Sequence, residues 1–282
     1  MNLSAAFPRF WADLKSPDFG RSDLARVIAV LPLAAIEQHG PHLPLDVDRV
    51  LVDGVIAAAI AHLPADLPVF FLPTQSVGFS PEHTRFSGTL TLKAGTLISL
   101  WTELAESVAA SGVKKLVLLN SHGGQAGLLD IVARDLRARL GMLVYSVNTF
   151  NLPLGSEQDE SVASVDKLFS AHEHRFGIHA GDIETSMMLA LKPGQVDMAK
   201  AQDFHSTSQD RAEKFSILGD GRSAKLAWQM QDYNPNGAAG NAAAATAGKG
   251  RALLGEMGRS LAHLLMEIDQ LPADTLRNDT AS

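Results

Sequence analysis

The sequence predicts an α/β fold, in which a mostly parallel central sheet carries helices on both of its faces. Short apolar segments alternate with longer segments whose apolar residues recur at every third or fourth position. An alternation of strand and helix, repeated at about 20 to 30 residues, is typical of parallel sheets. The chain of 282 residues shows no composition break that marks a boundary, so we expect a single domain over residues 1–282.

The expected elements follow one another along the chain. Strands are predicted at 27–33, 69–77, 115–120 and 142–147, and helices at 49–62, 97–111, 126–140, 183–191 and 242–265. Thr96 is expected to cap the second helix, and Gly112 and Gly141 to end the second and third helices. Residues 202–240 show no clear period, so we expect irregular structure there. Ligand sites in such sheets lie in the loops beyond the carboxyl ends of the strands.

Composition and missing motifs exclude several classes of protein. The chain has no cysteine, which excludes a disulfide scaffold, thiolate zinc sites and a cysteine nucleophile. Its net charge of −7 argues against a nucleic-acid partner, and its apolar runs are far shorter than the about 18 residues of a membrane span. No P-loop, G-x-S-x-G elbow or dinucleotide fingerprint is present. Met1 to Lys15 resemble no secretory signal, so we expect a cytoplasmic protein.

The first candidate site residues follow the first predicted strand, in the stretch EQHGPHLPLDVD. Glu37 and His39 stand two positions apart, so in extended backbone their side chains point the same way. With Asp48 they form a set of carboxylate and imidazole groups suited to Zn²⁺, Mn²⁺ or Fe²⁺. A polar surface loop is the alternative interpretation, because this spacing has no unique meaning.

Three further stretches carry polar groups near strand ends or helix starts. His122 lies in NSHGGQ, between the clearest strand and the clearest helix, where the glycines permit a tight turn close to a ligand. His179 and Glu184 lie around a predicted helix start, where a carboxylate can be a ligand or can favour the positive end of the helix. The stretch SPEHTRFSGT, which contains His83, is predicted to be a substrate-contacting loop or a turn.

In this order, the stretches resemble the creatininase (creatinine amidohydrolase) family. The resemblance is carried by LPLAAIEQHGPHLPLDVD, GFSPEHTRFSGTLTL, NSHGGQ, HAGDIETSMMLAL and GAAGNAAAATAGKG, from about residue 27 to about 255. It implies an α/β fold, a centre of two divalent metal ions per chain (Zn, Mn or Fe), and a homo-oligomer, commonly a hexamer. By this resemblance Asp48 matches the carboxylate that bridges both ions, and His179 matches a histidine beside the substrate. The other residues that match metal ligands are Glu37, His39 and His122, and Glu184 fills the acidic position of its motif.

The sequence also departs from the creatinine-hydrolysing members of that family. Those members carry a tyrosine and a metal-binding glutamate where this chain has Gly123 and Gly124, a catalytic glutamate at Ile178, and a substrate-stacking tryptophan at Arg175. The resemblance therefore points to the family's other branch. Its members include a formamidopyrimidine deformylase, a peptide-trimming enzyme of mycofactocin biosynthesis and hydrolases of oxidised inositols.

The resulting functional expectation is a metal-dependent amidohydrolase that uses a metal-activated water on a small-molecule substrate. The bond cleaved is expected to be that of a small cyclic amide, a formamide or a related C–N bond other than a peptide bond. His179 and Glu184 are the candidate catalytic residues: His179 for proton transfer, and Glu184 as a further metal ligand or as a carboxylate that orients a metal-bound histidine. Expected substrate contacts are His83, Gly123 and Arg175. The alternatives are cleavage of a C–C bond in an oxidised inositol, or a non-catalytic metal or metabolite binder.

Overall fold

The central sheet has four parallel strands in the order β2-β1-β3-β4. The computed structural model describes residues 8–20, 23–155, 165–221 and 223–277, so part of the segment in which no secretory signal is expected, Met1 to Lys15, lies outside it. The strands are β1 (Ile28–Leu33), β2 (Val69–Phe71), β3 (Lys115–Asn120) and β4 (Leu143–Asn148). The predicted fold class is confirmed.

The strand register brings the carboxyl ends of β1, β3 and β4 to one edge of the sheet. Leu33 pairs with Asn120, and Asn120 pairs with Asn148. All six residues of β1 are buried, as expected for a central strand covered on both faces. Any side chain that follows β1 or β3 therefore begins at this common edge.

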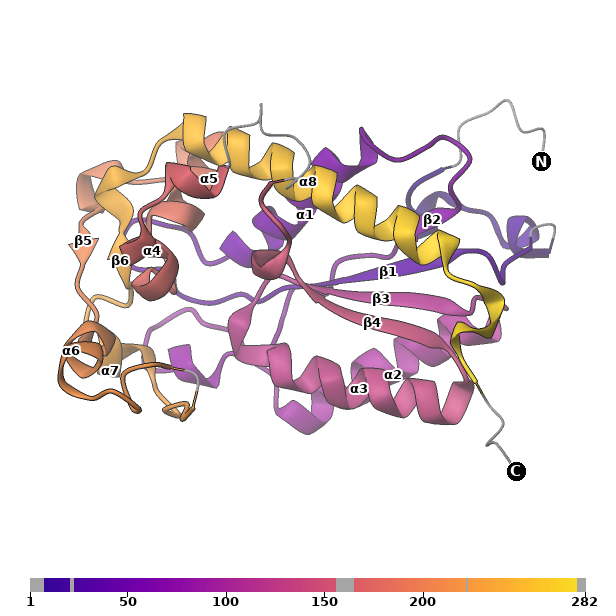
Figure 1. The fold of residues 1–282 in the computed structure, drawn as a ribbon, viewed down its shortest axis with the longest axis horizontal. Helices are drawn as coiled ribbons and strands as arrows, with labels where there is room; N and C mark the ends of the chain where they lie inside the picture. The colour runs from indigo at the N-terminus through magenta and orange to yellow at the C-terminus, as the bar shows by residue number, and fades with distance from the viewer. Residues whose placement is uncertain (1–7, 21–22, 156–164, 222, 278–282) are drawn as a thin grey trace.

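Helices cover both faces of the sheet, and alternate residues of β1 point to opposite faces. Ile28 and Val30 belong to the core that includes α1 (Val47–Ile60), α5 (Asp182–Leu191) and α8 (Ala247–Gln270). Ala29 and Leu31 belong to the core formed with α2 (Ala94–Ala110) and α3 (Ala126–Leu140). Figure 1 shows α8 and α1 above the sheet and α2 and α3 below it. This alternation with a period of two is what a pleated strand imposes.

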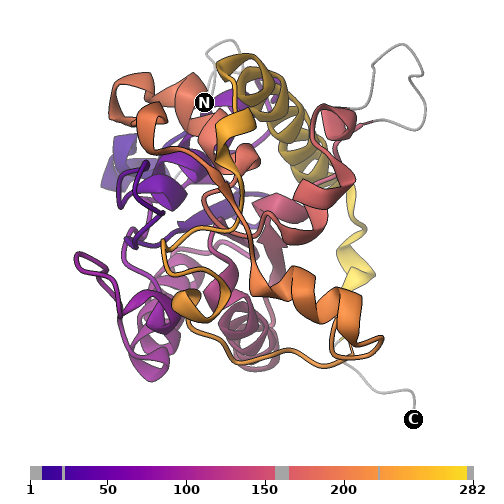
Figure 2. The same ribbon diagram turned by 90° about the vertical axis from the view of Figure 1, so that its left-hand side faces the viewer.

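The C-terminal third adds short elements beyond the carboxyl edge of the sheet. These are α4 (Ala171–Phe176), β5 (Asp203–Phe204), α6 (Thr207–Lys214), α7 (Met230–Tyr233) and β6 (Gly240–Asn241), with β5 and β6 paired antiparallel. They gather at the left of Figure 1 and face the viewer in Figure 2. The segment 202–240 was predicted to be irregular, and it is so except for these short helices and strands.

Three details of the predicted elements were wrong, the first being the last helix, which was predicted at 242–265 and runs over Ala247–Gln270 after a separate short turn at Ala242–Ala244. The strand predicted at 69–77 ends at Phe71, because Pro32 of β1 has no N–H with which to continue the ladder on that side. Thr96 does not cap α2, which begins at Ala94 with Lys93 as its N-cap residue. Gly141, in contrast, ends α3 as predicted, with a φ of 64° in the left-handed region that favours glycine.

None of the helices in the described ranges is both long enough and apolar enough to cross a membrane. The longest, α8, alternates buried and exposed residues along its 24 positions. That pattern is typical of a helix that packs one face on a core.

Candidate metal centre

Residues from three separate segments converge at the carboxyl edge of the sheet. Glu37 follows β1, His122 follows β3, and Asp48 lies in the first turn of α1; all three are buried. The loop after β3 is held by Asn120, whose Oδ1 accepts from the His122 N–H at 3.1 Å and whose Nδ2 donates to the His122 carbonyl at 2.6 Å. The Ser121 hydroxyl donates to the Asp48 carbonyl at 2.9 Å, which ties α1 to this loop.

Glu37, Asp48 and His122 form a first group of donors that could hold a metal ion. His122 Nδ1 lies 3.3 Å from Glu37 Oε1 and 3.4 Å from Asp48 Oδ2. Ligand atoms about 2.1 Å from a tetrahedral Zn²⁺ are about 3.4 Å apart, so the spacing of these three atoms suits one divalent ion.

A second group of donors shares Asp48 with the first. His39 Nε2 lies 3.8 Å from Asp48 Oδ1 and 4.0 Å from Glu184 Oε2. The two oxygens of Asp48 therefore face different groups, Oδ2 towards His122 and Oδ1 towards His39. A carboxylate in this arrangement can bridge two ions.

Hydrogen bonds on the far side of each imidazole leave its other nitrogen free for a metal. His39 Nδ1 donates to the Glu37 carbonyl at 3.0 Å, and His122 Nε2 donates to the Phe79 carbonyl at 2.9 Å. Both oxygens of Glu37, His39 Nε2 and Asp48 Oδ2 are buried without a hydrogen-bond partner. Burying such groups unpaired is costly, and bound cations remove that cost. The residues present therefore fit divalent metal ions.

The electrostatics of the cluster favour retention of positive charge. Burial and the neighbouring Glu37 raise the pKa of Asp48 well above its usual range. Burial acts to lower the pKa of His122, but Glu37, Glu82 and Asp48 around it raise that pKa well above its usual range. Groups so placed hold a proton or exchange it for a metal ion.

His179 lies beside both donor groups, forms with Glu37 and His39 a further set of atoms that could hold a metal ion, and has a fixed ring orientation. Its Nε2 donates to the Gln38 carbonyl at 2.7 Å, and its Nδ1 lies 3.8 Å from Glu37 Oε1. Its backbone pairs with Ala239 next to β6. Burial and the nearby His39 lower the pKa of His179 to about 4, so the ring is neutral at neutral pH and Nδ1 can accept a proton.

Glu184 lies in the first turn of α5 and was predicted either to bind a metal ion or to orient a metal-bound histidine. It contacts one group that bears on each role. Its Oε2 faces His39 and also accepts a hydrogen bond from the Ala180 N–H at 2.5 Å. Ala180 has a φ of 53°, which is unusual for a residue with a side chain. Glu184 thus belongs to the second donor group and also supports the strained residue that follows His179.

The three predicted substrate contacts differ in position. His83 is buried in the cluster, with Nε2 at 3.3 Å from Glu37 Oε1. Gly123 borders open space, since an added Cβ would meet nothing within 4 Å. Arg175 is exposed, and its guanidinium donates to the Gly219 carbonyl and lies over the Phe176 ring. A substrate contact by any of the three stays a prediction.

The structure adds residues to the site that the sequence did not single out. Glu82 lies 3.3 Å from His122 Nε2, and the Trp228 ring meets His83 edge-on with centroids 6.3 Å apart. Gln38 Nε2 donates to His83 Nδ1 at 2.7 Å. Glu82 and Gln38 stand next to the predicted site residues His83 and His39 in the sequence, and this adjacency could have identified them. Trp228 lies in residues 202–240, which show no periodic pattern, and no feature of the sequence indicated its place in the site.

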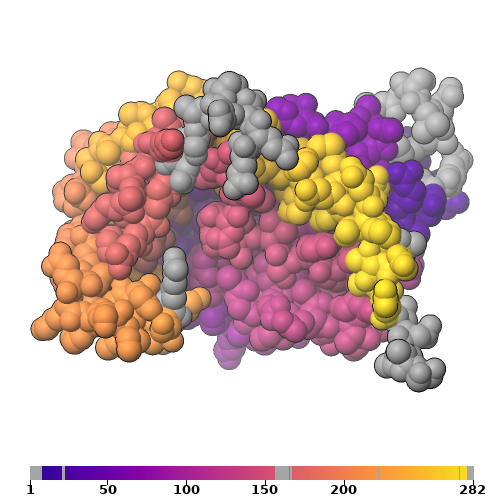
Figure 3. All heavy atoms as spheres, viewed as in Figure 1, coloured from indigo at the N-terminus to yellow at the C-terminus, as the bar shows by residue number. Residues whose placement is uncertain are grey.

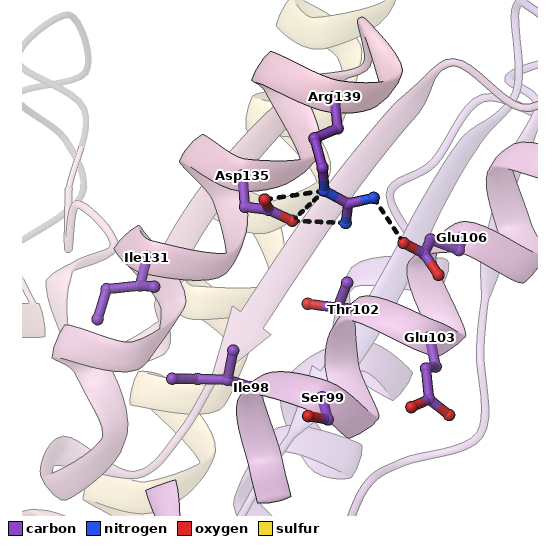
Figure 4. A pocket seen from close by; sticks show the side chains of 8 residues that line it. All are labelled: Ile98, Ser99, Thr102, Glu103, Glu106, Ile131, Asp135 and Arg139. Carbon is purple, nitrogen blue, oxygen red and sulfur yellow. Dashed lines mark hydrogen bonds and ion pairs between the residues drawn. The ribbon is translucent and has the colours of Figure 1, made fainter. Parts of the chain in front are cut away.

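The surface of the protein has a hollow near the C-terminal elements and a pocket elsewhere. The space-filling view is hollowed between the C-terminal elements and the sheet layer (Figure 3). A pocket elsewhere lies between α2 and α3, where Arg139 pairs with Asp135 at 2.6 Å and with Glu106 at 2.8 Å (Figure 4). One arginine and three carboxylates line this pocket, two of the carboxylates pair with the arginine, and the lining has no imidazole, so it offers no comparable set of donors.

The sheet topology and the paired donor groups define an α/β protein with a candidate binuclear metal centre at its carboxyl edge. The creatininase family, described as creatinine amidohydrolase, matches residues 12–265. The chain belongs to this family of amidohydrolases.

Curated relatives carry two different descriptions. A mycofactocin precursor peptide peptidase of Mycobacterium ulcerans (strain Agy99) is 31% identical over 235 residues, covering 81% of this chain and 80% of that protein. That of Mycobacterium tuberculosis (strain CDC 1551 / Oshkosh) is 35% identical over 173 residues and is matched over 59% of its length, as is this chain. A creatinine amidohydrolase of Pseudomonas putida is 27% identical over 188 residues, covering 62% of this chain and 68% of that protein.

Solved structures support the fold. A creatininase structure described with Mn superposes with a TM-score of 0.73 at 22% identity, covering 94% of this chain and 100% of that chain. A mutant creatininase of the Zn-Zn type gives a TM-score of 0.71 at 22% identity, covering 93% and 98%. At this identity the likeness establishes a common architecture.

Proposed function

We infer that this chain is a divalent-metal-dependent amidohydrolase whose ions are held by Glu37, His39, Asp48, His122 and Glu184. The observation that carries the inference is Asp48, whose two oxygens face two separate groups of buried donors. The unpaired oxygens of Glu37 and the unpaired His39 Nε2 support it, because ligation satisfies them. Creatininase structures described with Mn and with Zn support divalent ions of this kind.

Two ions, when bound, supply an activated water and polarise a carbonyl group. The protein's own residues supply orientation and proton transfer. Because His179 donates through Nε2 to Gln38, its Nδ1 is the atom that takes a proton during the reaction and gives it to the leaving nitrogen. His83 is held by Gln38 on the same side of the cluster, where it can contact the substrate carbonyl.

The proposed substrate is a small amide, either cyclic or a formamide, whose C–N bond is hydrolysed. Gly123, Gly124, Ile178 and Arg175 support a substrate other than creatinine, since they remove polar and aromatic groups that the resemblance assigns to creatinine-hydrolysing members. A second candidate, cleavage of an amide bond in a short peptide, is favoured by the relatives described as peptide peptidases, one of them matched over 81% of this chain. Cleavage of an oxidised inositol and simple metal storage are the remaining alternatives.

A metal analysis followed by a substrate panel tests this function. Purified protein is expected to carry about two divalent ions per chain, and chelation is expected to abolish turnover, which Zn²⁺, Mn²⁺ or Fe²⁺ restores. Creatinine is expected to be turned over about 10⁴-fold less efficiently than the best formamide, lactam, hydantoin or short peptide. Protein that neither contains nor binds these ions would overturn the proposal, and turnover confined to inososes would favour C–C cleavage. If creatinine were the best substrate of the panel, the proposed preference for amides other than creatinine would be refuted.

Glu184→Gln separates the two roles proposed for Glu184. If Glu184 is a ligand, the variant loses one of the two ions. If it orients neighbouring groups, metal affinity falls about 10- to 100-fold while both positions still fill at excess metal. We also propose that residues 1–282 form one such domain, that the enzyme is a cytoplasmic homo-oligomer, and that a hexamer is its assembly; mass photometry tests the last point.

A further inference from the structure

Glu82 shares no group of donors with His122 or His39, although with Glu37 and His83 it forms a further set of atoms that could hold a metal ion. It sits in the short turn Pro81–His83, next to His83, and is buried. Its Oε1 lies 3.3 Å from Nε2 of His122. The opposite ring atom, His122 Nδ1, is the one that faces Glu37 and Asp48. Glu82 therefore approaches His122 from the side away from these two donors.

Gly124 leaves the space that the Glu82 carboxylate occupies. A Cβ on Gly124 would lie 1.9 Å from Glu82 Oε1, which is far inside contact distance, and 2.5 Å from His122 Nε2. By contrast, the neighbouring Gly123 has room for a Cβ. The absence of a side chain at position 124 is thus what allows a carboxylate from a segment 40 residues earlier in the chain to reach His122.

His122 Nε2 is surrounded by a carbonyl, a carboxylate and the Ser80 hydroxyl, whose oxygen lies 3.4 Å away. The Phe79 carbonyl accepts at 2.9 Å, and the Glu82 carboxylate lies 3.3 Å away. A carbonyl fixes the direction of the N–H, whereas a carboxylate adds negative charge. A carboxylate behind a metal-bound imidazole fixes its tautomer and increases the basicity of the ligating nitrogen.

We propose that Glu82 is a positioning residue of the metal centre, which holds His122 with the proton on Nε2 and strengthens Nδ1 as a ligand. The proposal rests on the proposed function, because it requires that the cluster bind divalent ions. It assigns Glu82 no direct bond to an ion and no contact with substrate. Removal of its charge should weaken metal binding without removing a binding position.

The test is a competition titration of chelator-treated protein with Zn²⁺ and with Mn²⁺. Glu82→Gln keeps the size of the side chain and removes its charge, and it is expected to weaken the affinity about 10- to 100-fold while the number of ions bound at saturation stays that of the wild type. Glu82→Ala is expected to do the same. Glu103→Gln, the same substitution at an exposed position of α2, is the matched control and is expected to leave both quantities unchanged.

The outcomes separate this proposal from the function on which it rests. Wild-type affinity in both Glu82 variants would overturn the positioning role alone, because the metal centre would then be intact without the carboxylate. Loss of one ion at saturation would also overturn it, since Glu82 would then be a ligand. Failure of the wild type to bind either ion would overturn the proposed function itself. Thermal unfolding of the metal-free forms, expected to stay cooperative, shows that the variants fold.

Discussion

The two sides of the candidate site are built in different ways. On the sheet side, Glu37 and His122 lie in the loops after adjacent parallel strands, and the strand register brings those loops to one edge. On the C-terminal side, the segments around His179 are joined by Glu173, a buried carboxylate in α4 whose oxygens accept from the Asp182 N–H at 2.7 Å and the Asn241 N–H at 2.9 Å. A Cβ on any of three surrounding glycines, Gly177, Gly181 and Gly240, would lie within 3 Å of Glu173.

This difference shows where each side is sensitive to change. Regular backbone hydrogen bonds keep the sheet side in place, so a substituted side chain there changes chemistry more than structure. On the C-terminal side, a single carboxylate joins segments that are 68 residues apart in sequence. Loss of that carboxylate should therefore move His179 before it moves any ligand on the sheet.

The largest effect is expected for His122→Ala on the sheet side. Loss of an imidazole from the first donor group should weaken metal binding by more than the about 100-fold expected for a group outside the ligand set, and activity should fall with it. Inductively coupled plasma analysis measures the ions retained after dialysis. His263→Ala, at an exposed position of α8, is the control. A His122→Ala protein with its full metal content would show that the first group is not a metal site.

On the C-terminal side, His179→Ala should lower kcat by about 10²- to 10⁴-fold, the usual contribution of one proton-transfer group. Metal content should stay unchanged, because Glu37 and Asp48 remain on the sheet edge. Steady-state kinetics on the best substrate and metal analysis together measure this, with the exposed His205→Ala as control. Full activity would remove His179 from the mechanism, and loss of metal would make it a ligand.

Glu173→Gln should lower the free energy of unfolding by about 1 to 3 kcal/mol, because an amide NH₂ would face a backbone N–H that now has a carboxylate acceptor. Urea unfolding measures the change, and Glu213→Gln at an exposed position of α6 should stay within about 0.5 kcal/mol of the wild type. If the comparison between the two sides holds, kcat falls while metal affinity does not. Equal losses of both would mean that the two sides are not independent.

The smallest effect is expected for Trp228→Leu. The indole meets His83 edge-on and lies 4.8 Å from the Tyr233 ring, so we expect it to form a wall of the substrate pocket. Loss of an aromatic contact of about 0.5 to 1.5 kcal/mol should raise KM about 2- to 10-fold with kcat and metal content little changed. Leu226→Ala, an exposed neighbour, is the control. An unchanged KM would place Trp228 outside the pocket.

The sheet side could be predicted from the sequence because its signals are local. Apolar runs mark β1 and β3, and polar residues that directly follow parallel strands share one edge whatever the rest of the chain does. The extent of β2 could not be predicted from its own residues, since it ends where Pro32 of the neighbouring strand cannot donate. Pairing partners decide such boundaries.

The C-terminal side was harder to predict because its contacts are made between distant segments. His179 and Glu184 belong to a sequence motif that could be recognised. Neither the spacing nor the periodicity of the sequence indicated Trp228 or Glu173. Arg175 was predicted as a substrate contact because it stands where the resemblance places a substrate-stacking tryptophan; its guanidinium donates to the Gly219 carbonyl, and the substrate contact stays a prediction. Position in sequence sets where a backbone lies, and only tertiary packing decides where a long side chain points.

Asp48 has a consequence for the order in which the site fills. If two ions bind as proposed, the first would change the charge and the orientation of a ligand that the second needs, since the two oxygens of Asp48 face different donor groups. The two binding equilibria are then thermodynamically linked, and each ion alters the affinity of the other by the same factor. Partial loading would accordingly be governed by cooperativity, and an enzyme exposed to two metals could settle into a defined mixed-metal form.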